Sequence, residues 1–283
     1  MKTILYTTDY SKNSIPALHF AYGISQKMNA KMVALHVFDI PLVMGSTTSL
    51  TYARKEVKAI VLDKEKLASF CKEYLGNDPE KLNIAIKIME ETPISQGILK
   101  KAEEIEADLI VLGTKGNKPI GNYLLGSTTT TLIEKADCPI LAIPPNTPFK
   151  AIDKIVYASD FEGSDIFAIE DLIELAKPFD AEIYLVHITS KDNKTSADQM
   201  EWFKNMLHHK VHYENIHFET RFGVDVFKTL EKYVNEINPE IVAMLQREGH
   251  NLIKNLWHRN LVKRMKNEAH YPLLSFNKRN VAI

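Results

Sequence analysis

The chain has 283 residues, of which 45% are hydrophobic and 25% charged, and its formal net charge is −1. This length allows two domains of ordinary size, and the near-neutral charge gives no reason to expect nucleic acid or an acidic membrane surface as a partner. The two cysteines, Cys71 and Cys138, are too few for a disulfide framework, so we expect a reducing compartment.

The N-terminal segment MKTILYTTDY reaches an acidic residue at Asp9 and lacks the long apolar stretch of a signal peptide. No apolar run approaches the roughly 18 residues that a membrane-spanning helix needs. We therefore expect a soluble, cytoplasmic protein without a membrane partner.

Short apolar runs with strand character recur along the first part of the chain. They read TILYT, KMVALHV, LNIAIKIM, DLIVLG and PILAI. Continuous apolar runs of this length are typical of strands that are buried on both faces of a parallel sheet.

Helical patterns separate these runs. One helix face is predicted from the spacing of Ala17, Ala21, Ile24 and Met28. A second helix is predicted to start with Thr92 as N-cap and Pro93 in the first turn. Its buried stripe is expected at Ile94, Ile98, Ala102 and Ile105. Strands that alternate with helices in this way imply right-handed crossovers and a doubly wound α/β sheet.

The rest of the chain repeats this pattern. TILYTTDY at 3–10 aligns with KIVYASDF at 154–161, and CPILAI at 138–143 aligns with YPLLSF at 271–276. The helix stripe recurs as Val226, Leu230, Val234 and Ile237. We predict two copies of one α/β domain, residues 1–146 and 152–283, each with a parallel five-stranded sheet flanked by helices. The connector PPNTPFKAID contains three prolines, which suit a stiff link.

We expect the two copies to pack together about a pseudo-twofold axis. Their last strands, PILAI and PLLSF, are the candidates for this contact. Such packing would make a pseudo-dimer within one chain, and it leaves both a monomer and a homodimer of tandem chains open.

Four of the 11 glycines fall within LGTKGNKPIGNYLLGSTTTT, at positions 113, 116, 121 and 126. Glycine lets a backbone turn sharply and approach a ligand without a Cβ clash. A helix N-terminus is predicted after Gly126, and its N–H groups and dipole favour a phosphate. Hydroxyl groups and positive charges accompany it, from Ser127, Thr128, Thr129, Thr130, Lys115 and Lys118. The alternative is a flexible loop that ends in a Ser/Thr N-cap.

The position of this loop favours a binding site. In a doubly wound sheet, ligands bind outside the carboxyl ends of the strands. Asp9, the segment from His36 to Asp39, and Gly113 are all expected to lie at such strand ends. Three separate segments are therefore predicted to converge at one edge of the sheet.

The chain resembles a tandem universal stress protein over nearly its full length. Nucleotide-binding members of that family carry Gly, two residues, Gly, nine residues, Gly, and then Ser or Thr. This pattern is matched by Gly113, Gly116, Gly126 and Ser127. The family's Asp after the first strand is matched by Asp9 in YTTDYS, and its apolar residue after a His in the second strand by Val37 in LHVFD.

The resemblance implies two Rossmann-like domains of the adenine nucleotide alpha hydrolase type. It also implies ATP, with Mg²⁺, as a regulatory ligand in a stress response, retained or turned over slowly. The residues expected to contact the nucleotide are Thr8, Asp9, Val37, Gly113, Gly116, Gly126, Ser127 and Thr128. At most a weak ATPase is expected, because Glu134 and Asp137 lie too far along the following helix to act as a general base.

The second copy lacks the glycine pattern. It reads AMLQREGHNLIKNLWHRN, which places Leu245 or Gln246 opposite Gly113 and Arg259 opposite Gly126. These side chains would obstruct a triphosphate, so we expect the nucleotide site in the first copy alone, with Asp160 as a structural remnant. Basic residues between positions 247 and 266 predict a solvated helix face or, alternatively, a surface for an anion, a nucleic acid or an acidic partner. They are Arg247, Lys254, Arg259, Lys263, Arg264 and Lys266.

Histidines gather in LHHKVHYENIHF, at positions 208, 209, 212 and 217. On a helix, His208 and His212 would share a face, as zinc ligands often do, but no Glu or Cys completes a ligand set, so a surface cluster is expected. His36 and His187 occupy the same strand position in the two copies, which favours a structural role. Residues 41–56, PLVMGSTTSLTYARKE, are interpreted as a lid or an interface loop.

Two alternatives to a nucleotide-binding regulatory protein stay open. One is a slow ATPase built on the same sheet, and the other is an interaction scaffold that acts without nucleotide. The sequence names no protein partner.

Overall fold

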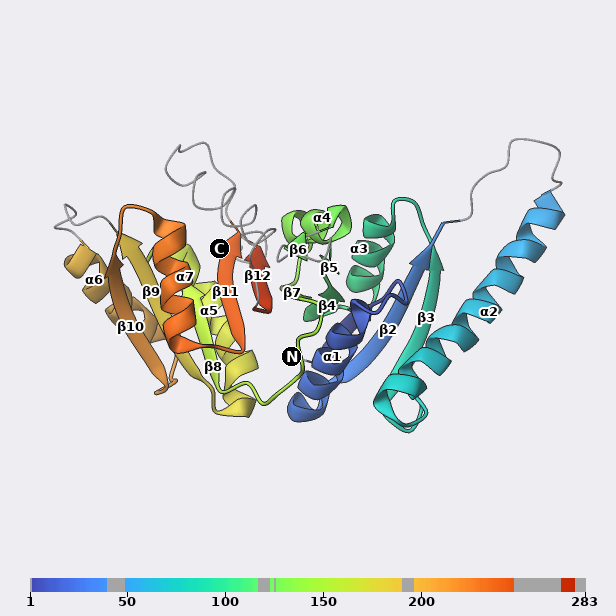
Figure 1. The fold of residues 1–283 in the computed structure, drawn as a ribbon, viewed down its shortest axis with the longest axis horizontal. Helices are drawn as coiled ribbons and strands as arrows, with labels where there is room; N and C mark the ends of the chain where they lie inside the picture. The colour runs from blue at the N-terminus through green and yellow to red at the C-terminus, as the bar shows by residue number, and fades with distance from the viewer. Residues whose placement is uncertain are drawn as a thin grey trace.

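The computed structural model describes residues 2–39, 49–116, 123–124, 126–189, 196–246 and 271–277. Within these residues, ten strands form one continuous sheet in the order β10-β9-β8-β11-β12-β7-β4-β1-β2-β3. Two groups of elements lie side by side along this sheet (Figure 1). We call the elements up to β7 the first half and those from β8 onward the second half.

The first half contributes five parallel strands to the sheet. They are β1 (Thr3–Thr7), β2 (Lys31–Phe38), β3 (Ile84–Glu90), β4 (Leu109–Gly113) and β7 (Ile140–Ile143). Its helices are α1 (Ser14–Met28), α2 (Ser49–Leu75), α3 (Ile94–Glu104) and α4 (Ser127–Lys135). Between β4 and α4, the short strands β5 (Lys115–Gly116) and β6 (Tyr123–Leu124) form a separate antiparallel pair.

The second half repeats this arrangement with five more parallel strands. They are β8 (Lys154–Ala158), β9 (Glu182–Thr189), β10 (Ile216–Phe222), β11 (Ile241–Gln246) and β12 (Leu273–Asn277). The helices described here are α5 (Gly163–Ala176), the short 3₁₀ helix η1 (Lys177–Phe179), α6 (Ser196–Lys210) and α7 (Val226–Ile237). The predicted α/β fold with two tandem five-stranded parallel sheets is confirmed.

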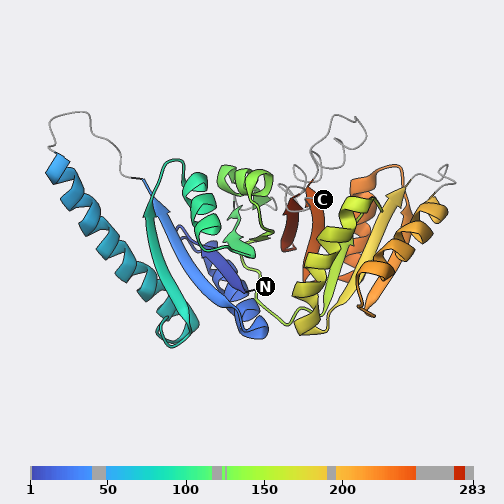
Figure 2. The same cartoon turned by 180° about the vertical axis from the view of Figure 1, so that it is seen from behind.

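Successive strand residues point into two separate cores. Ile4 and Tyr6 of β1 pack into one core, and Leu5 packs into the other. Side chains of α1, α2, α5 and α6 cover the first core, and those of α3, α4 and α7 cover the second. Seen from behind, α2 lies at one end of the sheet and α6 at the opposite end (Figure 2). The strands are apolar on both faces because helices cover both faces.

The two halves join through their last strands, as predicted. Strand β12 pairs with β7 in antiparallel orientation, with Leu274 opposite Leu141. This pairing merges two parallel sheets into one and gives each last strand a neighbour on both sides. Within the described residues, no helix combines the length and the apolar character that spanning a membrane requires.

Some predictions of local structure were wrong. Helix α3 starts at Ile94 with Pro93, not Thr92, as its N-cap, because Pro93 still has an extended backbone with ψ of 155°. Ile94 is 42% exposed and does not belong to the buried stripe. Helix α6 ends at Lys210, so His212 lies beyond it and shares no helix face with His208.

Other predictions fall outside the described residues. Residues 41–48 of the expected lid are not described, while the segment from Ser49 onward is the beginning of α2. All six residues of the predicted basic stretch in the second copy also lie outside the described ranges, as do Lys118 and Gly121 of the glycine loop.

Candidate nucleotide site

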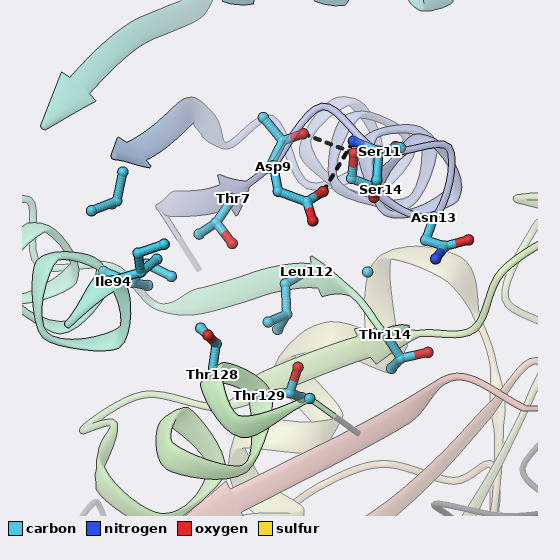
Figure 3. A pocket seen from close by; sticks show the side chains of 15 residues that line it. Thr7, Asp9, Ser11, Asn13, Ser14, Ile94, Leu112, Thr114, Thr128 and Thr129 are labelled. Atoms are coloured by element: carbon cyan, nitrogen blue, oxygen red, sulfur yellow. Dashed lines mark hydrogen bonds between the residues drawn. The ribbon is translucent and has the colours of Figure 1, made fainter. Parts of the chain in front are cut away.

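A pocket of about 380 Å³ opens at the carboxyl ends of β1, β2 and β4 in the first half. This is the edge at which a doubly wound sheet binds its ligands. The lining comes from the loop between β1 and α1, from the inner faces of β2, α3 and β4, and from the start of α4 (Figure 3). The residues are Thr7, Thr8, Asp9, Ser11, Asn13, Ser14, Val37, Ile94, Ile98, Leu112, Gly113, Thr114, Gly126, Thr128 and Thr129.

The loop between β1 and α1 is held by hydrogen bonds of its own. The hydroxyl oxygens of Thr8 and Ser14 lie 2.8 Å apart, and Thr8 Oγ1 accepts the Tyr10 N–H at 2.9 Å. Asp9 Oδ1 accepts the Ser11 N–H at 3.0 Å, which closes an Asx turn. Among the lining residues of this loop, Asp9 is the one with an ionisable side chain.

One wall of the pocket is apolar. It is formed by Val37 of β2, Leu112 of β4 and two isoleucines of α3, Ile94 and Ile98. Helix α3 lies close to β2 at this point, since a Cβ added to Gly97 would be 2.7 Å from Val37 Cγ1. The result is a narrow apolar surface beside a carboxylate, which suits a flat heterocycle that carries polar edges.

The opposite side of the pocket is the N-terminus of α4. Gly126 is the N-cap, and as a glycine it has no side chain with which to cap the helix. The first helical backbone bond runs from the Thr130 N–H to the Gly126 carbonyl at 3.0 Å, so the preceding N–H groups face outward from the helix end. Thr128 and Thr129 lie here, across the pocket from Asp9 (Figure 3).

The pocket wall also contains an unsatisfied hydroxyl group. Thr114 Oγ1 is buried and has no hydrogen-bond partner among the described residues. Buried polar atoms in proteins normally have a partner. Together with the N-terminus of α4, this hydroxyl suits a ligand that carries anionic or other hydrogen-bonding oxygens.

Gly113 has a structural reason to be glycine. A Cβ at this position would lie 2.2 Å from the Asn13 carbonyl oxygen and 3.0 Å from Ser14 Cα. The end of β4 therefore approaches the start of α1 too closely for any side chain. We expected this glycine to make room for a ligand, but the contact with the α1 backbone already requires it.

Six of the eight residues predicted to contact a nucleotide line this pocket: Thr8, Asp9, Val37, Gly113, Gly126 and Thr128. Of the other two, Ser127 is an exposed residue at the first position of α4 and does not line the described pocket. Gly116 is in β5, where it pairs with Tyr123. The sequence patterns did not point to Ser11, Asn13 or Thr114 as residues of the site. Ser11 and Asn13 follow Asp9 in the loop before α1, and this proximity is the one signal that could have identified them.

The sequence profile of the universal stress protein family matches residues 1–144. The chain belongs to the universal stress protein family. A universal stress protein from Methanocaldococcus jannaschii is 29% identical over 142 residues, which make up 50% of this chain and 81% of that protein. A Staphylococcus aureus protein that carries the same family name is 30% identical over 148 residues, 50% of this chain and 83% of its own length.

A solved structure shares the fold of the whole chain. The crystal structure of a universal stress protein from Archaeoglobus fulgidus matches with a TM-score of 0.69 at 16% sequence identity, and the match covers 98% of each chain. The two-domain tandem form of the universal stress fold, predicted from the sequence, is therefore confirmed.

The strand register decides which residue of the second half corresponds to Gly113. Thr7 pairs with Leu112 in the first half, and Ala158 pairs with Met244 in the second. The residue after Met244 is Leu245, so Leu245 and not Gln246 stands opposite Gly113. Its side chain is buried in the core, with 2% exposed.

The second half also replaces a hydroxyl group with a carboxyl group. Asp165 of the second half aligns with Ser14 of the first half. The Asp165 carboxylate accepts hydrogen bonds from Tyr157 Oη at 3.0 Å and from Ser159 Oγ at 2.9 Å. It also accepts the Glu162 N–H at 3.2 Å and thereby takes part in the capping box of α5. The second half uses this edge of its sheet for internal hydrogen bonds.

The aligned histidines make the same contact in both halves. His36 Nδ1 donates to the Thr8 carbonyl oxygen at 2.8 Å, and His187 Nδ1 donates to the Ser159 carbonyl oxygen at 2.9 Å. Each bond ties the second strand of its half to the loop after the first strand. This repetition supports the structural role that we predicted.

The histidine cluster of the second half is spread over different contacts. His217 stacks on Tyr184 with ring centroids 4.7 Å apart, and its Nε2 lies 3.2 Å from Glu182 Oε2. The rings of His208 and Phe218 lie with their centroids 6.3 Å apart. Within the part of the chain that the structure describes, no group of three His, Cys, Asp or Glu residues is arranged to hold a metal ion.

Proposed function

We propose that the first half of this universal stress protein binds ATP as a regulatory ligand in a stress response, and that the second half is a structural partner without a nucleotide site of its own. The observation that carries the proposal is a pocket that combines Asp9, an apolar wall and the N-terminus of α4. The glycine pattern of nucleotide-binding relatives leads into this same helix.

The pocket offers one surface for each part of ATP. The adenine would lie against Val37 and the isoleucines of α3, with Asp9 beside it as a hydrogen-bond acceptor for a polar edge of the ligand. The phosphates would lie at the N-terminus of α4, where the N–H groups and the hydroxyls of Thr128 and Thr129 favour anionic oxygens. The buried Thr114 hydroxyl, which has no partner among the described residues, adds a further donor in the wall.

Magnesium is compatible with this arrangement as part of the ligand. Mg²⁺ commonly retains several waters and binds through one or two protein oxygens together with the phosphates of a nucleotide. Thr128 and Thr129 carry the hydroxyl groups at the phosphate end that would contact such an ion or its waters. The ion would neutralise phosphate charge and would need no cluster of protein carboxylates.

A regulatory role fits this site better than rapid hydrolysis. Asp9 is the one carboxylate among the described residues that line the pocket, and its Oδ1 already accepts the Ser11 N–H. A general base needs a position within hydrogen-bond reach of the attacking water, near the transferred phosphate. Asp9 lies across the pocket from α4, next to the proposed adenine position (Figure 3).

Two features support the absence of a nucleotide site from the second half. Leu245 occupies the position of Gly113 and packs into the core. Asp165 occupies the position of Ser14 and is buried in a hydrogen-bond network. Both changes fill the strand edge with side chains of the half itself.

The first test is to measure nucleotide content. The protein is purified without added nucleotide and denatured, and any released small molecule is identified and quantified by chromatography and mass spectrometry. We expect about one adenine nucleotide per chain. About two per chain would contradict the one-site proposal. None, followed by no heat of ATP binding in calorimetry, would contradict ATP binding altogether and favour a nucleotide-independent scaffold.

A pair of matched substitutions then locates the site. Asp9 and Asp160 occupy equivalent positions in the two halves, so Asp9→Ala and Asp160→Ala remove the same group from each. Asp9→Ala should weaken ATP binding by about tenfold, the loss expected for a hydrogen bond to a charged group, whereas Asp160→Ala should leave the Kd unchanged. Equal effects of the two substitutions would contradict a site confined to the first half.

A further inference from the structure

A side chain of the second half caps the helix that forms the phosphate end of the pocket. Asn277, the last residue of β12, donates its Nδ2 amide to the Glu134 carbonyl oxygen at 3.0 Å and to the Ala136 carbonyl oxygen at 3.3 Å. Its side chain is buried, with 5% exposed. These bonds satisfy carbonyl groups at the C-terminal end of α4, which the helix itself leaves without partners.

Helix α4 is short enough for this cap to matter along its whole length. It has nine residues, and an isolated helix of this size is marginal in water. Its buried residues Leu132 and Ile133 hold it against a core that includes Leu273 of β12. Asn277 and Leu273 therefore fix the helix from the second half, while Thr128 and Thr129 at its other end line the pocket.

A second connection runs through the sheet. Strand β7 lies between β12 and β4, and the Ile143 carbonyl of β7 accepts the Thr114 N–H at 2.9 Å. Thr114 and Gly113 line the pocket. The second half thus contacts two of the elements that build the phosphate end: α4 directly, and β4 through one intervening strand.

The internal symmetry of the sequence places no equivalent side chain in the first half. The alignment of CPILAI with YPLLSF places Pro144 opposite Asn277. Proline has no side-chain donor and cannot cap a helix of the second half in this way. The amide cap therefore serves the first half alone, the half that carries the proposed nucleotide site.

We propose that Asn277 is a positioning residue for the nucleotide site, and that through it the second half sets the nucleotide affinity of the first. This inference rests on the proposed binding of ATP at α4. When the C-terminal end of α4 is fixed, its N–H groups and threonine hydroxyls are already in place, so less ordering is needed when the phosphates bind. The degenerate half is then a regulatory element, because any event that displaces β12 also loosens the phosphate site.

Two substitutions at Asn277 test the mechanism in graded steps. Asn277→Ala removes the donor and leaves two carbonyl groups unsatisfied. Asn277→Asp keeps the shape but places a carboxylate, which only accepts hydrogen bonds, against the same two carbonyl oxygens. We expect the Kd for Mg-ATP, measured by calorimetry on nucleotide-free protein, to rise about fivefold in the first variant and about twentyfold in the second.

A matched control separates positioning from general loss of stability. Asn215 also lies in the second half, and its Nδ2 donates to Asp180 Oδ1 at 2.9 Å. Asn215→Asp makes the same chemical change and creates repulsion between carboxylates, but away from α4. It should lower the melting temperature and leave the Kd for Mg-ATP within twofold of the wild type.

The pH dependence provides a readout that a purely structural defect would not change. Protonation restores one O–H donor to the carboxyl group in Asn277→Asp, so the ratio of its Kd to that of the wild type should shrink as the pH falls from 7 toward 5. A Kd within twofold of the wild type at pH 7 in both Asn277 variants, while the wild type binds Mg-ATP, would overturn the role of Asn277 and leave the proposed function intact. If the wild type itself binds no adenine nucleotide, the proposed function fails, and the positioning role fails with it.

Discussion

Replacing Gly113 with alanine should destabilise the first half and weaken the pocket together. The added Cβ would lie 2.2 Å from the Asn13 carbonyl oxygen, and the gap must open by roughly 1.2 Å to reach an ordinary contact of 3.4 Å. The obstacle is backbone and not the end of a flexible side chain, so β4 or the start of α1 must move. Overpacking of this kind costs about 1–3 kcal/mol. For a chain of 283 residues the melting temperature should fall by roughly 2–5 °C.

Thermal unfolding of nucleotide-free protein, followed by circular dichroism, measures this effect without stabilisation by bound ligand. Gly163→Ala is the control, because a Cβ there meets nothing within 4 Å and the residue begins α5 in a conformation that alanine can adopt. It should leave the melting temperature unchanged or raise it slightly. ATP affinity should fall in Gly113→Ala alone, since Asn13 and Ser14 also line the pocket. A melting temperature within 1 °C of the wild type for Gly113→Ala would refute the steric explanation of this glycine.

Two further predictions follow from ionisable groups outside the pocket. Burial raises the pKa of the Cys71 thiol to about 12, and burial together with the nearby Asp108 and Asp137 carboxylates raises the pKa of Cys138 to about 12. Both thiols should therefore resist iodoacetamide at pH 8 in the folded protein and react after denaturation. The intact mass of the protein counts the attached labels, and rapid labelling of the native protein would contradict the burial of these thiols. Burial is the largest cause that raises the pKa of Asp171, and the nearby carboxylates of Glu170, Glu174 and Asp108 raise it further. Because the pKa is raised in the native state, the contribution of Asp171 to the stability of the fold is present at low pH and is lost as the pH rises through that pKa. Asp171→Asn should therefore raise the melting temperature at pH 7, and the gain should disappear below about pH 4, near the pKa of an unperturbed aspartate; a gain that is equal at both pH values would rule out this electrostatic origin.

The sequence by itself determined the order of the elements and the repetition of the domain. Continuous apolar runs fix which segments become buried parallel strands, because each residue must face one of two covered sides. The repeat then placed CPILAI and YPLLSF in equivalent positions at the end of each copy, and these strands form the contact between the halves. The site edge followed as well, since in this topology Asp9, Val37 and Gly113 all come at the carboxyl ends of strands.

The tertiary structure decided what depends on distances between segments far apart in the sequence. The spacing of the glycines cannot show that the α1 backbone lies 2.2 Å from where a side chain at Gly113 would be. The start of α3 at Ile94 depends on backbone angles that residue preferences do not fix. Asn277 reads locally as the polar end of a strand, yet it caps a helix 141 residues away. Local periodicity reports which face of an element is buried, but the partner that covers that face is set by the packing of the whole chain.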